Sequence, residues 1–137
     1  MRPSPRSLSG PTIALAVVAT FCLAISAIAQ ESSFRNAPAS TAQMKNPYEG
    51  NAGAVAAGKK LYGQNCSQCH GNNLQGMGPA PALINPATRK AKPGELFWFI
   101  TNGDLNKGMP SWAGLPKPQR WQIVTFLESR FSQGETK

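Results

Sequence analysis

The sequence has 137 residues, of which 14 are lysine or arginine and 6 are aspartate or glutamate, so its formal net charge is +8. This length fits one small domain. The positive charges are scattered rather than gathered on a basic helix or among aromatic residues, which argues against nucleic-acid binding and favours an acidic protein partner or an anionic membrane surface.

The N-terminus has the three parts of a secretory signal peptide. Arg2 and Arg6 precede an apolar run that ends in the small-residue pattern Ala-Ile-Ala at 27–29. A transmembrane anchor is the alternative, but the run is short for a span and no basic residue follows it directly. We therefore predict a signal peptide over residues 1–29 and export to the periplasm.

The next segments predict a leader, a helix and a loop. Residues 30–46 are rich in Ala, Ser, Asn and Gln, which predicts a flexible leader before a domain over 47–137. From about Asn51 apolar residues recur at helical spacing, which predicts a helix that ends near His70. Residues 72–92 are rich in Gly, Pro and Asn without a period, which predicts a long wrapped loop of functional importance.

Two further helices are predicted after this loop. The first covers about 95–102 and stops at Gly103. After an irregular stretch over 104–116, Pro118 suits the first turn of a last helix, where its missing N–H costs nothing. No alternating β pattern and no repeat competes. The predicted fold class is all-α, with loops so long that something other than protein must fill the middle.

The motif Cys66-Ser67-Gln68-Cys69-His70 is a C-x-x-C-H sequence, the signature of covalent haem c attachment. Positions i, i+3 and i+4 of a helix project from one side, so both thiols can bond the haem vinyl groups while the imidazole reaches the iron. A thioredoxin-like dithiol would need a βαβ pattern, which is absent. A zinc site would need a second ligand pair, and the chain has one histidine. A structural disulfide would leave the adjacent histidine unexplained.

The iron of an electron carrier needs a sixth ligand, and the candidates are Met44, Met77 and Met109. Met44 lies in the predicted leader. Met77 follows His70 by seven residues in a short loop, too close to reach the opposite face of the haem. Met109 follows the second predicted helix between a glycine and a proline, which favour a fixed backbone approach. We predict Met109 as the axial ligand, and a His/Met pair raises the iron potential as an electron shuttle requires.

The region from about Asn51 to Ser129 resembles the class I, or mitochondrial-cytochrome-like, c-type cytochromes of bacteria. The sequence at 58–62, Gly-Lys-Lys-Leu-Tyr, is similar to the first-helix pattern of that family. Asn102-Gly103 and Gly108-Met109-Pro110 resemble its approach to the methionine ligand. The resemblance implies a small cytochrome c fold of three to five helices wrapped around one covalently bound haem c.

The resemblance also implies roles for several neighbours of the haem. The first-helix glycine would allow a close crossing by the last helix, through Ile123, Phe126 and Leu127. Pro81-Ala82-Leu83 resembles the P-x-L pattern of the family, in which the proline carbonyl accepts a hydrogen bond from the histidine ligand and the leucine packs on the haem. Pro79 is the alternative acceptor. A carbonyl at this place would orient His70 and strengthen it as a ligand.

These features predict a periplasmic electron carrier rather than an enzyme, which shuttles single electrons between redox proteins. It would act as a monomer or as a subunit of a larger oxidoreductase, with an exported dehydrogenase as donor or a terminal oxidase or reductase as acceptor. Lys107, with Lys92 or Lys117, is predicted to attract an acidic partner, and a partner complex could bring it to a membrane surface. The alternative is a haem enzyme or gas-binding sensor with a labile sixth ligand.

Overall fold

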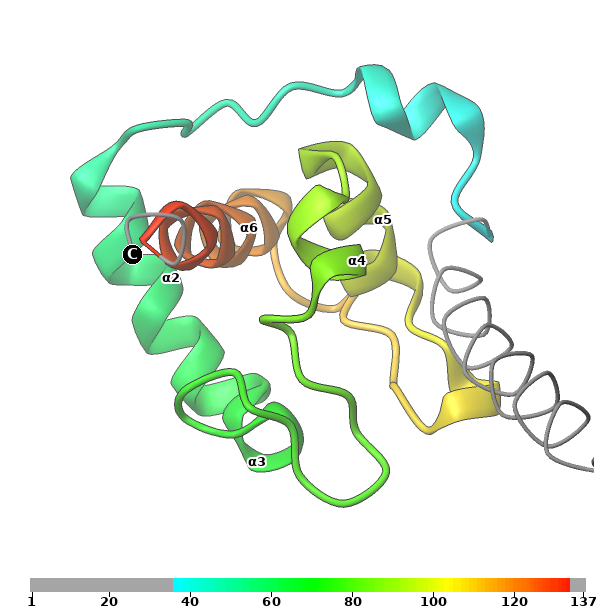
Figure 1. Ribbon diagram of the computed structural model, residues 1–137. Helices are drawn as coiled ribbons and strands as arrows, with labels where there is room; N and C mark the ends of the chain where they lie inside the picture. The colour runs from blue at the N-terminus through cyan, green and yellow to red at the C-terminus, as the bar shows by residue number, and fades with distance from the viewer. Residues whose placement is uncertain (1–35, 134–137) are drawn as a thin grey trace, which may run out of the picture. The chain divides into compact units, whose positions relative to one another are not determined.

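The computed structural model describes residues 36–133, within a compact unit that spans Phe34–Lys137. Within these residues the chain forms helices and two isolated bridges but no strand, as the predicted all-α cytochrome c fold requires (Figure 1). The elements in chain order are the 3-10 helix η2 (Ala39–Gln43), α2 (Ala52–Asn65), α3 (Ser67–His70), α4 (Pro86–Lys90), α5 (Pro93–Asn102), the 3-10 helix η3 (Leu105–Lys107) and α6 (Lys117–Ser132).

The first and last long helices, α2 and α6, cross at very close range. A Cβ atom at Gly58 would overlap the carbonyl oxygen of Gln122 and lie 2.9 Å from the Cβ of Phe126. One turn further along α2, the ring of Tyr62 lies 5.3 Å from that of Phe126. The close crossing implied by the resemblance is therefore present. The residues of α6 that Gly58 contacts are Gln122 and Phe126. Ile123, the neighbour of Gln122, is instead buried in the core.

The hydrophobic core is formed by residues of α2, α5 and α6 together with Leu74. Phe97 stacks on Trp121 with a centroid distance of 4.2 Å and an interplanar angle of 15°. The guanidinium carbon of Arg120 lies 4.9 Å from the centroid of the Phe97 ring, within the range of a cation–π contact. Val124 is completely buried beside them. These contacts hold the two helices together.

Residues 36–46 pack on the helices, although the sequence predicts a flexible leader over 30–46. A Cβ at Gly94 would overlap the carbonyl oxygen of Thr41, so η2 lies directly against α5. Met44 packs against the hydrophobic core. The segment lacks an apolar period, which is why its composition suggests a flexible chain. The segment can approach α5 so closely because Gly94, more than fifty residues further along the chain, has no side chain.

A buried amide fastens the end of this segment to α6. Asn46 is 5 % exposed and donates hydrogen bonds to the hydroxyl of Thr125 (2.9 Å) and to the carboxylate of Glu128 (2.6 Å). Because a buried polar group must be hydrogen-bonded, these two bonds specify where the segment lies. The domain therefore begins on the N-terminal side of the predicted boundary at residue 47.

The predicted loop over 72–92 contains a short helix, α4. Asn85 caps it by accepting a hydrogen bond from the backbone N–H of Thr88 (2.9 Å), and Pro86 occupies the first turn. Five residues are too few to show a hydrophobic period, so the pattern predicts only loop. The helix predicted over about 95–102 is α5, which begins at Pro93, and its predicted stop at Gly103 agrees with the structure.

Among residues 36–133, no helix is both long and apolar enough to cross a membrane. The predicted signal peptide over 1–29 lies outside the residues that the structure describes.

We expect Gly58→Ala to lower the free energy of unfolding by about 2–3 kcal/mol, because an added methyl group in a packed interface forces the helices apart. Gly63 is the matched control, since it lies in the same helix and a Cβ there would meet nothing within 4 Å. Gly63→Ala should stabilise the protein by about 0.5–1 kcal/mol through helix propensity. Denaturant unfolding of both variants measures the difference, and equal effects would contradict the close crossing.

A second prediction concerns Glu128. Burial raises its pKa and the nearby charge of Glu49 adds to this, whereas the hydrogen bond from Asn46 opposes it. The folded state therefore holds the proton more tightly than the unfolded state, so stability falls as pH rises through the interval between the two pKa values.

Glu128→Gln removes this titration and keeps an oxygen that can accept the hydrogen bond from Asn46. We expect the variant to have the higher melting temperature at neutral pH, with a difference that shrinks below the ordinary glutamate pKa of 4.5. Thermal unfolding at several pH values measures it. A difference that does not depend on pH would show that the carboxylate is not strained by burial.

Candidate haem attachment site

The C-x-x-C-H motif lies at the junction of α2 and α3. The predicted single helix is interrupted at Cys66, whose φ of −120° departs from helical values, and a new turn begins at Ser67. The backbone N–H of His70 donates to the carbonyl of Cys66 (2.9 Å), which closes this turn. Cys66 and Cys69 are both free thiols, the first partly buried and the second exposed. One short helical turn thus holds both thiols and the imidazole.

The environment of Cys66 does not favour a redox-active dithiol. Burial, with a smaller contribution from the charge of Cys69, raises the pKa of the Cys66 thiol to about 12. Redox-active cysteines of the thioredoxin kind have a lowered pKa, because the thiolate is the nucleophile. The raised pKa of Cys66 therefore differs from that of a thioredoxin-like dithiol.

His70 is oriented by a backbone carbonyl in the loop that follows it. Its Nδ1 atom lies 2.9 Å from the carbonyl oxygen of Pro81, whereas Pro79 is exposed and is not the hydrogen-bond partner. A carbonyl can only accept, so Nδ1 carries a proton, and in the neutral imidazole Nε2 then keeps its lone pair. This is the tautomer that a metal ligand needs.

The loop over 71–85 is held close to the motif by backbone bonds. The N–H of Gly76 donates to the carbonyl of His70 (2.8 Å), and the N–H of Leu83 donates to that of Leu74 (2.8 Å). Leu74 has a φ of +66° and is completely buried, a rare conformation for a leucine. The hydroxyl of Tyr62 donates to the carbonyl of Gly71 (2.7 Å) and secures the beginning of the loop.

Gly76 is in close contact with the backbone of Pro81 and Ala82. A Cβ at Gly76 would lie 2.6 Å from the backbone nitrogen of Ala82 and 2.8 Å from the carbonyl carbon of Pro81, and its φ is +78°. No other residue type fits both requirements. Gly76 therefore keeps the Pro81 carbonyl within reach of His70. Composition alone does not single this glycine out among its neighbours.

Met109 lies in a separate loop, which reciprocal hydrogen bonds hold firmly. The N–H of Met109 donates to the carbonyl of Asp104, and the N–H of Asp104 donates to that of Met109, each over 2.9 Å. Gly103 packs against this pair, since a Cβ there would lie 2.6 Å from the carbonyl oxygen of Met109. Met109 is partly buried and Met77 is 53 % exposed. No described interaction of residues 36–133 joins Met109 to His70.

The residues of this region fit a covalently attached haem. The two free thiols and the available Nε2 of His70 belong to one helical turn. Leu83, expected to pack on the haem, is partly buried and packs against the hydrophobic core. Within residues 36–133 no three or more His, Cys, Asp or Glu side chains gather as they would around a bare metal ion.

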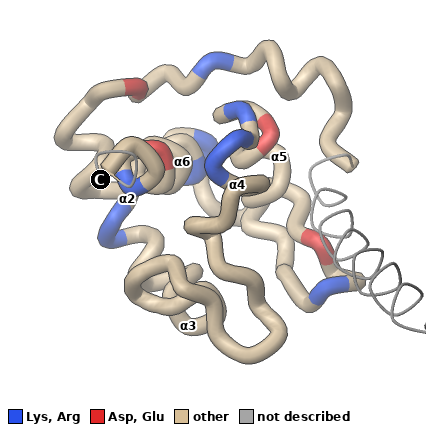
Figure 2. Tube along the Cα trace, viewed as in Figure 1, with Lys and Arg blue, Asp and Glu red and all other residues tan. Residues whose placement is uncertain are grey.

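The three lysines predicted to attract a partner belong to different elements. Lys107 ends η3 and lies 3.8 Å from the carboxylate of Asp104, which offsets its charge. Lys92 precedes α5 and Lys117 begins α6. The chain trace in Figure 2 shows no basic cluster around α3. The charge that the sequence suggests for docking is therefore not concentrated at the motif.

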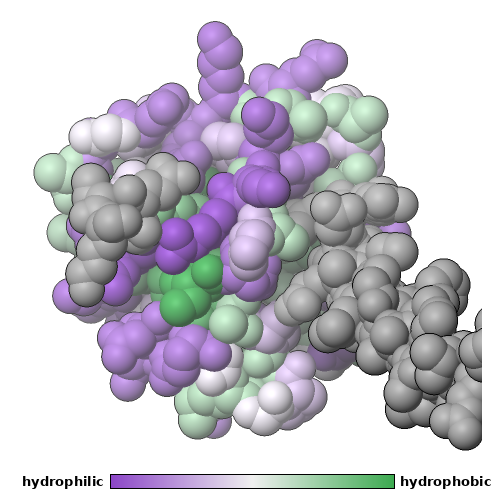
Figure 3. Space-filling model, viewed as in Figure 1, coloured by the Kyte–Doolittle hydropathy of each residue, from purple (hydrophilic) through white to green (hydrophobic). Residues whose placement is uncertain are grey.

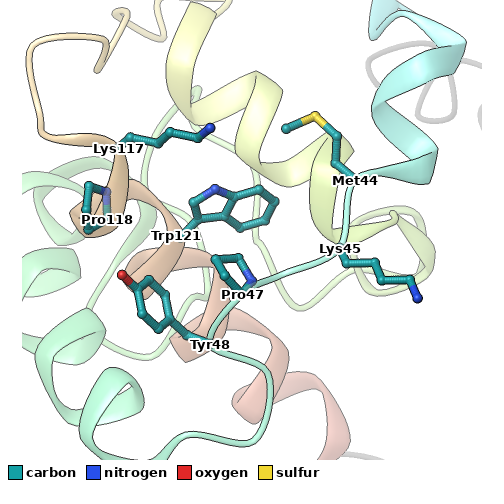
Figure 4. A pocket seen from close by; sticks show the side chains of 7 residues that line it. All are labelled: Met44, Lys45, Pro47, Tyr48, Lys117, Pro118 and Trp121. Carbon is teal, nitrogen blue, oxygen red and sulfur yellow. The ribbon is translucent and has the colours of Figure 1, made fainter.

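The beginning of α6 and the segment before α2 line a pocket that contains none of the motif residues (Figure 4). It contains neither cysteine nor histidine, and Trp121 forms its floor between two lysines at the rim. Its lining residues are Met44, Lys45, Pro47, Tyr48, Lys117, Pro118 and Trp121.

Comparison with known proteins gives a family match and two related proteins. Residues 53–127 match the family described as cytochrome c oxidase, cbb3-type, subunit III. The chain is 36 % identical over 98 residues to quinohemoprotein alcohol dehydrogenase ADH IIB of Pseudomonas putida, a match that covers 69 % of this chain and 14 % of the dehydrogenase. It is 44 % identical over 41 residues to cytochrome c-554(547) of Halothiobacillus neapolitanus, covering 30 % of this chain and 45 % of that protein. The matches thus span less than half of either relative.

We expect Gly76→Ala to raise the midpoint potential of the haem-loaded protein by on the order of 50 mV, close to a tenfold change in a one-electron equilibrium. The added methyl group would displace the Pro81 carbonyl and weaken its hydrogen bond with His70. A less basic imidazole stabilises ferric iron less.

Gly78→Ala is the matched control, because Gly78 also has a positive φ (+56°) but a Cβ there would meet nothing within 4 Å. Its potential should stay close to that of the wild type. Redox titration of both variants separates displacement of the carbonyl from general strain of the loop, and equal shifts would contradict the positioning role of Gly76.

Proposed function

The chain belongs to the c-type cytochrome family described as cytochrome c oxidase, cbb3-type, subunit III, and we propose that it carries single electrons between redox proteins through one covalently bound haem c. Cys66 and Cys69 would hold the haem by thioether bonds, and Nε2 of His70 would bind the iron. When bound, the haem supplies the one-electron chemistry, and the protein contributes attachment, orientation and an apolar surrounding.

The arrangement at α3 is the observation that carries this proposal. Two free thiols and a histidine share one helical turn, and the hydrogen bond from His70 to Pro81 places a proton on Nδ1, so that Nε2 is the ligand atom of the neutral ring. A dithiol enzyme would not need an adjacent histidine whose tautomer is set in this way. A histidine ligand with a fixed orientation serves an electron carrier, because it limits the rearrangement that accompanies each change of iron charge.

Met109 is proposed as the second axial ligand. Its backbone is fixed on both sides by the reciprocal bonds with Asp104 and by the close contact with Gly103. A thioether ligand stabilises ferrous iron and raises the potential. Met109 would also occupy the sixth coordination position, which a haem enzyme or a gas sensor needs open. This is why we propose a carrier rather than a catalyst.

We further propose that the protein works in the periplasm, exported by the segment at 1–29. The match to part of a quinohemoprotein alcohol dehydrogenase supports a dehydrogenase as donor or as the complex in which the domain is a subunit. The family description supports an oxidase as acceptor. An acidic partner, suggested by the net charge of +8, would have to approach basic side chains that lie away from the motif.

We expect Met109→Ala to abolish the weak near-infrared absorption band of methionine-bound ferric haem and to lower the midpoint potential. Met77→Ala is the control, because Met77 is exposed and should leave both properties unchanged. Absorption spectra and redox titration of the purified, haem-loaded variants test this. If wild-type protein has high-spin ferric haem, or binds carbon monoxide readily, the haem enzyme or gas sensor becomes the better assignment.

A further inference from the structure

Arg120, in the first turn of α6, contacts both ends of the segment that joins α5 to α6. Its Nε atom donates a hydrogen bond to the carbonyl of Leu115 (3.1 Å), and its Nη1 atom donates to the hydroxyl of Thr101 (2.5 Å). Thr101 is the last residue but one of α5, and Leu115 lies two residues before the start of α6. One guanidinium group therefore joins the residue that leads into this segment to a residue at its other end.

The segment between these two contacts contains Met109, the proposed sixth ligand of the iron. We call residues 103–116 the Met109 loop. In Figure 1 the loop, coloured yellow to orange, runs out from the end of α5 and returns to the beginning of α6. Its two ends therefore lie close together, and Arg120 is bonded to both sides of this junction.

Packing of side chains holds the Met109 loop only in part. Trp112 and Leu115, near its end, pack against the hydrophobic core, but none of the loop residues is fully buried and Leu105 is 78 % exposed. Figure 3 shows that hydrophilic side chains surround a small, strongly hydrophobic patch on the visible face, so apolar surface is scarce there outside the core. Polar contacts at the base of the loop must supply the remaining support.

Several hydrogen bonds meet at this base. The hydroxyl of Ser111 donates to the carbonyl of Thr101 (2.6 Å), and the N–H of Trp112 donates to the carbonyl of Ile100 (3.0 Å). These bonds attach the returning half of the loop to the end of α5. Through Arg120, α6 joins the same set of bonds, so the base of the loop is fixed to a helix of the core.

A guanidinium group suits this position because it is planar and its donors point in fixed directions. Two different nitrogen atoms of Arg120 reach two acceptors that lie on opposite sides of the loop base. The ring of Phe97, with its centroid 4.9 Å from the guanidinium carbon, restricts the orientation of the group. A lysine would have the same charge without this fork. The contact therefore depends on shape as well as on charge.

We propose that Arg120 is a positioning residue for Met109, which keeps the Met109 loop closed and thereby keeps the sixth coordination position occupied. This inference rests on the proposed ligation by Met109 and adds the residue that controls how easily that ligand is replaced. Arg120 acts through the base of the loop, because its contacts are with Thr101, Leu115 and Phe97.

Local opening of the loop connects a side chain at its base with a ligand at its far end. An open loop gains conformational freedom, and a link between its two ends restricts that freedom. Opening of this kind occurs without unfolding of the whole domain. Without the link through Arg120, Met109 should leave the iron more often, and an external ligand can then take the vacant position.

Binding of imidazole to the ferric, haem-loaded protein tests the proposal. We expect Arg120→Gln to bind imidazole about tenfold more tightly, because the apparent affinity rises with the fraction of molecules whose loop is open. Arg120→Lys should resemble Arg120→Gln to within about twofold, since it keeps the charge and loses the fork. Absorption titrations measure these affinities. A lysine variant with wild-type affinity would show that charge alone suffices and would contradict the proposal.

Two further variants control for charge and identify the contact. Arg130→Gln removes the same charge near the other end of α6, where Arg130 is exposed and bonded to Gln133, and should stay within about twofold of the wild type. Thr101→Val removes one acceptor and keeps the shape of the side chain, so it should also strengthen imidazole binding. Combined with Arg120→Gln, it should add no more than about twofold, because both changes break the same bond.

Amide hydrogen exchange distinguishes positioning of the loop from a general loss of stability. The N–H of Met109 is bonded to Asp104 within the loop, whereas Leu127 is buried in α6. Arg120→Gln should accelerate exchange at Met109 about tenfold and exchange at Leu127 by clearly less. Equal acceleration at both amides would mean that the whole domain has been destabilised, and the proposal would be overturned.

Failure of this inference and failure of the proposed function give different results. If the wild type shows the near-infrared band of methionine ligation and Arg120→Gln leaves its imidazole affinity within about twofold, the inference is overturned while the proposed ligation stands. If the wild type lacks the band, Met109 is not the ligand, and the inference fails together with the proposed ligation.

Discussion

The close approach of α2 and α6 at Gly58 is the contact on which the rest of the fold depends. With no side chain at this position, the backbone of Gln122 can reach α2, and the ring of Phe126 then lies against Tyr62. The Tyr62 hydroxyl in turn binds the carbonyl of Gly71 at the beginning of the loop. A helix crossing remote from the motif thus determines where that loop starts. An electron carrier needs such a rigid frame, because its iron ligands must stay in place in both oxidation states.

The loop that meets His70 and the loop that contains Met109 are held in a similar way, although neither contains a regular element of any length. Backbone bonds close each of them, and a glycine with positive φ fills the closest point of each, Gly76 in one and Gly103 in the other. A domain of this size buries too little apolar surface to hold long loops by side-chain packing alone. Close backbone contact, together with a covalently attached cofactor, supplies what a larger core would otherwise provide.

The net charge of the chain and the charge of the surface around the motif are different properties. The basic residues keep the protein positively charged at long range, while the surface around Cys69 and His70 is neutral. Long-range charge affects how often two proteins meet, and contact chemistry decides which of them remain in place long enough to react.

The sequence by itself determined the family of the chain and predicted the chemistry at Cys66, Cys69 and His70, because this information lies within one helical turn and a few short patterns. It also indicated the long helices, and it led to Met109 as a predicted ligand. Only the tertiary structure decided that Pro81 rather than Pro79 meets His70, that residues 36–46 pack on α5 and α6, and that the charges lie away from the motif. Each of these depends on how segments far apart in the sequence approach one another. Glycines at the points of closest contact and buried hydrogen bonds determine that approach. Neither produces a periodic pattern that could be recognised in the sequence.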